Sequence, residues 1–164
     1  MSGPTRVNCA IYSPMSNAAP YIGGGEAQFL FQQVWAWGTS TGQMNKRYLG
    51  SRSLGTGANE DIDLKDLTDE SGAAINIVEL RLFCIHNPSS NDGTLEVKPS
   101  ASNGHLGFLK DATDVLIIHP GGIAIIAIPL DGAAAVGATT DNVNIKNNGG
   151  GTVVYGLLVG GVDA

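Results

Sequence analysis

Apolar and polar residues alternate over several short stretches, as they do in β-strands with one buried face. The alternation is clear in residues 61–64, 94–98 and 142–146. In residues 75–86 both alternating sets are apolar toward the end, with Leu80, Leu82 and Cys84 on one side and Phe83 and Ile85 on the other. This stretch predicts a central strand that is covered on both faces.

Three more apolar runs predict strands at residues 115–118, 123–128 and 152–159. The first two are joined by His119-Pro120-Gly121-Gly122, which has the residue types of a tight reversal. Residues 26–37 fit helical spacing in part, but their aromatic content favours a strand, and we interpret them as one. Turn clusters rich in Gly, Asn and Pro separate these runs. The chain is therefore predicted to be all-β, an antiparallel sandwich or barrel.

Residues 1–25 differ from the rest of the chain. They contain Pro4, Pro14, Pro20 and three consecutive glycines, and Arg6 carries their only side-chain charge. Proline disfavours a helix and is typical of extended or edge segments. We interpret residues 1–25 as an extended N-terminal arm and residues 26–164 as the folded domain; a loose terminus is the alternative.

Composition narrows the function classes. Of 164 residues, 43% are hydrophobic and only 15% are charged, and the net charge is −6. This balance supports a folded core and disfavours disorder. Residues 1–58 carry a net +3 and residues 59–164 a net −9, so a nucleic-acid partner is not expected. The acidic excess either keeps the protein soluble or leaves the basic N-terminal part to meet an acidic partner.

No membrane association is expected from the sequence. The longest apolar stretch, residues 115–130, is interrupted by the turn at His119-Pro120-Gly121-Gly122, and neither half is long enough for a membrane helix. The first residues do not form an apolar signal segment. Cys9 and Cys84 are too few and too far apart for a disulfide scaffold or a zinc site, so both are expected to be reduced. These features predict a protein that is made in a cytoplasm.

One acidic segment offers a candidate cation site. Asn59, Asp61, Asp63 and Glu70 fall at ligand positions of a calcium-loop template, but Leu64 occupies the position that requires glycine. The simpler interpretation is a strand in which Ile62 and Leu64 face the core while the aspartates face water. We therefore assign no metal ligand, and leave cation binding by Asp61, Asp63 and Glu70 open.

Catalytic and cofactor motifs are not recognised. His86, His105 and His119 are too widely spaced for a ligand motif, and no nucleophile elbow occurs. The glycine-rich segments lack the residues that a phosphate loop or a dinucleotide site needs. We predict that the protein is not an enzyme and uses no cofactor.

Aromatic and arginine side chains are the candidate protein-interface residues, because these types dominate interface energetics. In a strand Trp35 and Trp37 would share a face, for which core packing or a sugar-binding platform are the alternatives. The candidates are Tyr12, Tyr21, Trp35, Trp37, Arg47, Tyr48 and Arg52.

Four blocks carry a family resemblance. Residues 48–64, 95–104, 118–122 and 141–147 resemble turn-and-strand blocks of small virion proteins of tailed bacteriophages, of the capsid decoration or cement type. The resemblance implies a jelly-roll-like β-sandwich that supplies no catalytic residues. It implies a homotrimer that binds the major capsid protein and stabilises the phage head. Such a protein would lie on the outer capsid surface of the virion. A tail or head–tail connection protein and a carbohydrate-binding adhesin are the alternatives.

Overall fold

The structure is a computed structural model that describes residues 4–14, 26–69, 71–128 and 134–163, without the side chains of residues 9–14 and 26–31. All regular elements in these ranges are strands, which confirms the expected all-β fold. Their bounds are β1 Thr5–Pro14, β2 Glu26–Trp37, β3 Gln43–Met44, β4 Lys46–Leu54, β5 Asn59–Asp63, β6 Leu67–Thr68, β7 Ala74–Ile75, β8 Ile77–His86, β9 Leu95–Pro99, β10 Leu116–Ile118, β11 Ile123–Ala127, β12 Asn142–Asn147 and β13 Val153–Asp163.

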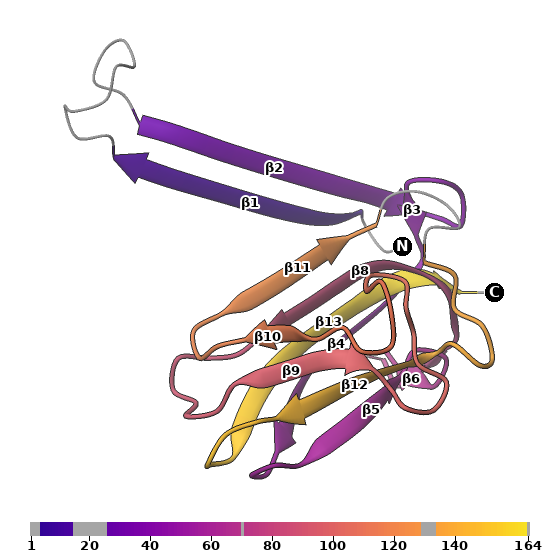
Figure 1. The fold of residues 1–164 in the computed structure, drawn as a ribbon. Coiled ribbons are helices and arrows are strands. Elements are labelled where there is room, and N and C mark those ends of the chain that lie inside the picture. The colour runs from indigo at the N-terminus through magenta and orange to yellow at the C-terminus, as the bar shows by residue number, and fades with distance from the viewer. Residues whose placement is uncertain (1–3, 15–25, 70, 129–133, 164) are drawn as a thin grey trace.

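Two antiparallel four-stranded sheets form the body of the molecule (Figure 1). One has the order β11-β8-β13-β4, and the other has the order β10-β9-β12-β5. They stack as the two layers of a β-sandwich, which is the predicted architecture. β6 and β7 form a small separate ladder.

The main core lies between the two sheets. It forms because every second residue of each strand points inward, and these residues are apolar: in β13, Val153, Tyr155, Leu157 and Val159 are all buried. Phe83 of β8 stacks on Phe108 from the long β9–β10 connection, with ring centroids 5.0 Å apart. Burial of these side chains is the main favourable contribution to folding.

A second, smaller core lies on the other side of β8. Trp35, at the end of β2, packs with Met44 and Leu82, and all three are buried. Gly160 makes the approach possible, because a Cβ atom there would lie 2.3 Å from the Met44 sulfur. β8 is therefore covered on both faces at Leu82, as predicted, but Cys84 on the same outer side is only half-buried.

β1 and β2 form a long antiparallel hairpin that extends away from the sandwich (Figure 1). Their register runs from the pair Thr5 and Trp35 to the pair Pro14 and Glu26. The strand interpretation of residues 26–37 is confirmed. The expected division into residues 1–25 and 26–164 stays a prediction, and it would separate two strands that pair with each other.

The sequence prediction is confirmed at one turn and is incomplete in its strands. The His119-Pro120-Gly121-Gly122 segment is a turn, in which the Gly122 amide donates to the His119 carbonyl at 2.8 Å. However, β10 and β11 on either side of it belong to different sheets, so the turn carries the chain across the sandwich. The prediction missed β4, whose partly buried and exposed residues alternate as far as Ser53, and it missed the two-residue strands β3, β6 and β7.

Two buried asparagines hold the loops at one end of the sandwich. The Asn87 side-chain amide donates to the carbonyls of Gly93 and Ile118, at 2.9 and 3.0 Å. The Asn147 amide lies near the carbonyls of Leu54, Gly55 and Gly151, at 3.1, 3.0 and 2.6 Å. These buried side-chain amides thus supply hydrogen-bond donors to the loop carbonyls at this end.

We predict that Asn147→Ala lowers the free energy of unfolding by about 1–3 kcal/mol, because it removes the donor of the buried hydrogen bond to the Leu54 carbonyl. Asn148→Ala is the matched control: the neighbouring Asn148 is exposed and its side chain binds Glu96 at the surface. Its change should stay within about 0.5 kcal/mol. Chemical denaturation measures both variants, and equal losses would contradict the role assigned to Asn147.

Candidate functional site

The outer face of the β11-β8-β13-β4 sheet carries a continuous apolar row. Ile125, Cys84, Leu158 and Leu49 are in register across the four strands. Leu49 is 59% exposed and Ile125 is 38% exposed. Two more exposed apolar residues, Ile123 and Val154, lie on the same face. We call this surface the outer apolar face; its members are Leu49, Cys84, Ile123, Ile125, Val154 and Leu158.

Charge is nearly absent from this face. Four cross-strand rows of outward-facing residues make up this face, from the row of Ser53 to the row of Arg47 on β4. Besides the apolar members, these rows contain Ser51, Ser53, Arg47, His86, Gly156, Gly160, Leu82 and Ala127. None of these is a carboxylate, although the chain has 15 Asp and Glu residues. Exposure of such an uncharged apolar area to water is unfavourable in free energy, and a surface of this kind is typical of a protein-binding site.

The outer face of the opposite sheet has the contrary character. Glu96, Lys146 and Asn59 form one row across β9, β12 and β5. Lys98, Asn144 and Asp61 form the next row. Charged and amide side chains therefore cover β9, β12 and β5 with groups that water solvates well, and exposed Ile117 of the edge strand β10 adds one apolar position beside Glu96.

The two tryptophans have different environments. Trp35 is fully buried in the second core, so the core-packing alternative holds for it. Trp37 is 52% exposed, and it lies two residues further along β2, where β3 pairs with it. Of the two, only Trp37 offers an aromatic surface to a partner.

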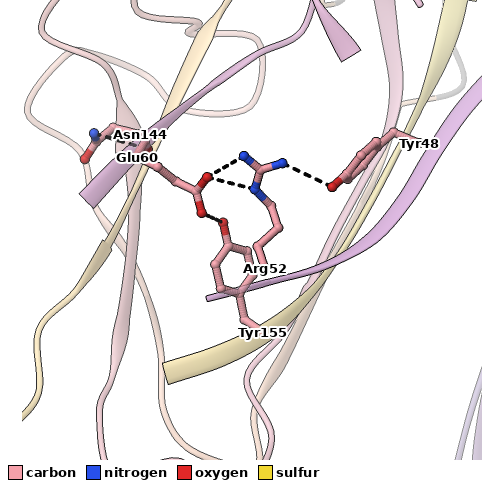
Figure 2. A network of polar contacts seen from close by, with 5 residues as sticks. All are labelled: Tyr48, Arg52, Glu60, Asn144 and Tyr155. Atoms are coloured by element: carbon pink, nitrogen blue, oxygen red, sulfur yellow. Dashed lines mark hydrogen bonds and ion pairs between the residues drawn. The ribbon is translucent and has the colours of Figure 1, made fainter. Parts of the chain in front are cut away.

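Tyr48 and Arg52 take part in a polar network that joins β4 to β5 (Figure 2). The Arg52 guanidinium binds the Glu60 carboxylate, with Nε donating to Oε2 at 2.8 Å. Its Nη1 donates to the Tyr48 hydroxyl at 3.1 Å, and the buried Tyr155 hydroxyl donates to Glu60 Oε1 at 2.6 Å. β4 and β5 belong to different sheets, so this network links the two layers.

The network fixes the ionisation of Arg52 and Tyr155. Hydrogen bonding to Glu60 raises the pKa of Arg52 above its ordinary value, so the guanidinium stays charged. Burial, together with the bond to Glu60, raises the pKa of Tyr155 and keeps the phenol protonated as a donor. Both side chains therefore act within the sandwich, and Arg52 is committed to an internal partner.

We predict that Glu60→Gln lowers the free energy of unfolding by about 1–2 kcal/mol, because Arg52 loses its counter-charge in a half-buried site. Glu96→Gln serves as the control, since Glu96 lies on a strand and its carboxylate accepts one bond from exposed Asn148. Denaturant titration compares the two. Similar, small losses would show that the ion pair contributes nothing to the joining of the sheets.

The remaining interface candidates are dispersed. Arg47 is exposed at the edge of the outer apolar face, on β4. Tyr12 lies on β1, but its side chain is outside the description, and Tyr21 lies outside the described residues altogether. The predicted set therefore does not form one patch within the part of the chain that the structure describes.

The candidate cation segment forms strand β5, as the simpler interpretation predicted. Ile62 and Leu64 are buried in the main core and Asp61 is exposed, whereas Asp63 is partly buried. Asp61 accepts a hydrogen bond from Asn144 at 2.7 Å, and Asp63 accepts one from the Lys65 amide at 2.8 Å. Glu70 lies outside the described residues. Among the described residues no group of three or more His, Cys, Asp or Glu side chains is placed to hold a metal ion.

The three histidines have separate environments. His86 and His119 are exposed, whereas His105, which lies within the β9–β10 connection, is buried. The Nδ1 of His105 donates to the Thr140 carbonyl at 3.0 Å, and burial lowers the pKa of its imidazole despite the charge of Asp141 nearby. The neutral ring is the form that the fold accommodates.

This lowered pKa predicts a stability loss in mild acid. As pH falls, His105 takes up a proton in the unfolded chain at about pH 6.5, before it does so in the native protein. The native state therefore loses stability as pH falls from about 6.5 toward the lower pKa that His105 has in the folded protein. Between about pH 7.5 and 5, His105→Asn should show a smaller fall in unfolding free energy than the unchanged protein. Identical pH profiles for the two proteins would contradict the buried neutral ring.

Sequence reasoning missed the outer apolar face and two members of the network, Glu60 and Tyr155. A usable signal was present for the face, because residues 123–128 and 153–159 are apolar on both alternating sets. No local pattern marks the network, because its members come together only when β4, β5 and β13 pack.

Comparisons with known proteins leave the family open: no family model matches the chain, and no curated protein matches it. In the described ranges, no helix has the length and hydrophobicity needed to cross a bilayer.

Proposed function

We propose that this protein is a structural virion protein that decorates a phage capsid, binding the major capsid protein on the outer surface of the head and stabilising it. The observation that carries the proposal is the outer apolar face, which is partly exposed and free of carboxylates and so is typical of a component of a protein assembly. The sequence blocks that resemble decoration proteins indicate which assembly this is.

The physical properties of the chain suit such a role. Only 15% of its residues are charged, so little charge has to be desolvated when it contacts other proteins. Many copies on a regular lattice, associated with one another as a homotrimer, would convert weak single contacts into strong overall attachment. The role requires neither catalysis nor a cofactor.

The proposal extends to the topology of the sandwich, which we assign as a jelly roll. The eight body strands, in chain order, are β4, β5, β8, β9, β10, β11, β12 and β13. The first, eighth, third and sixth form one sheet in that order, and the second, seventh, fourth and fifth form the other. This alternation between sheets is the arrangement expected of two intertwined Greek keys.

The test is a binding assay with expanded, undecorated capsids built from the major capsid protein of the same phage. The full chain should sediment with them at a fixed stoichiometry, and should stay in the supernatant when the capsids already carry their decoration. Electron microscopy of labelled particles should show it over the whole head. A chain that never sediments with capsids would refute the proposal, and label confined to the tail would replace it with the connection-protein alternative.

A further inference from the structure

The outer apolar face is only partly covered by its own chain. At one end of β8, Trp35 and Met44 cover Leu82. One row further along the sheet, Cys84 is half-buried and its neighbours Ile125 and Leu49 are exposed. The cover that the base of the hairpin provides therefore ends within this second row, where it reaches Leu158 but leaves Ile125 and Leu49 exposed.

The described part of the β1–β2 hairpin, in turn, has no surface of its own sandwich to pack against beyond its base. Beyond its base it extends away from the sandwich (Figure 1), and β3 pairs only with Ala36 and Trp37. For the rest of its described length it has two strands, and a two-stranded hairpin is only marginally stable in water without something to pack against. The hairpin thus needs a surface that its own body does not supply.

The residues of the hairpin match the face. Positions 33, 31 and 29 follow Trp35 at intervals of two, and they are Gln33, Phe31 and Phe29. They pair with Val7, Cys9 and Ile11 of β1. This register series is mainly apolar and contains no charged residue. The row of Ile125, Cys84, Leu158 and Leu49 on the sheet is likewise apolar and uncharged. The second core already contains a small contact between the two surfaces within one chain. There, Trp35 and Val7 at the base of the hairpin pack with Leu82, Ala127 and Leu158 of the sheet.

From these observations we infer that the outer apolar face binds the β1–β2 hairpin of a second copy of this chain. The contact joins two different surfaces, so each copy uses its hairpin on one neighbour and its face on another. Contacts of this kind close into a ring when the rotation between copies permits it. The inference rests on the self-association in the proposed function, and adds the surfaces that carry it.

The first measurement is the oligomeric state of the full chain by sedimentation velocity over a range of concentrations. The unchanged protein should associate. Leu49→Asp on the face and Phe31→Asp in the hairpin should each weaken association on the order of tenfold or more. Ile117→Asp is the matched control, because Ile117 is 53% exposed on the outer face of the opposite sheet, and it should associate like the unchanged protein. Circular dichroism verifies folding, and Leu49→Ser replaces Leu49→Asp if that variant unfolds.

Mixing the two variants tests the pairing itself. A Leu49→Asp copy keeps its hairpin and a Phe31→Asp copy keeps its face, so an equimolar mixture should form dimers at concentrations where each variant alone is monomeric. If only Leu49→Asp disrupts association, faces bind faces; if only Phe31→Asp does, hairpins bind hairpins; either result overturns the inference. A mixture that stays monomeric, or an unchanged protein that never associates, overturns it as well.

Capsid sedimentation of the same proteins separates this inference from the proposed function. A chain that is monomeric in solution and yet decorates capsids would refute the hairpin contact and leave decoration standing. A chain that associates through hairpin and face but never binds capsids would retain the contact and refute decoration. A monomeric chain whose Leu49→Asp variant alone loses capsid binding would assign the outer apolar face to the capsid instead.

Discussion

The apolar side chains between the two four-stranded sheets stay out of water only while both sheets remain in contact, and this packing positions everything else in the molecule. Each strand contributes alternate residues to the interior, as β13 does with Val153, Tyr155, Leu157 and Val159. The same alternation fixes which residues point outward. The outer apolar face is thus a direct result of the register that buries the core.

Apolar residues are distributed unevenly around this core. The sheet that carries Glu96, Lys146 and Asp61 follows the usual pattern, with one face buried and one face solvated. The β11-β8-β13-β4 sheet does not, since its outer positions are also apolar and the chain covers only one end of them. We expect a protein with such a sheet to associate with other proteins, because association buries the exposed apolar face.

The sequence predicted the fold class and most strands, because alternation and turn residues are local signals. It identified β5, β9 and β12 from three clean patterns, and it resolved residues 26–37 in favour of a strand on aromatic content alone. It missed β4, where Gly50 and several serines dilute the apolar signal. It also could not distinguish Trp35 from Trp37, since both share a strand face and only the position of the sheet beneath them makes one buried and the other exposed. The candidate Arg52 has the residue type of an interface anchor, but its partner Glu60 comes from a strand in the other sheet, and such a pairing has no signature along the chain.

The way in which the hairpin is attached has a consequence for how this protein can change over evolutionary time. Because the base is held by Trp35 and Met44 while β1 and β2 pair residue by residue beyond it, the hairpin can lengthen or shorten without disturbing the sandwich. Within the paired part, matched insertions of two residues on each strand keep every residue beyond them on its own side of the ribbon. A single inserted residue would exchange the two sides from that point outward. Relatives of this chain with insertions within the paired part should therefore differ there by even numbers of residues per strand.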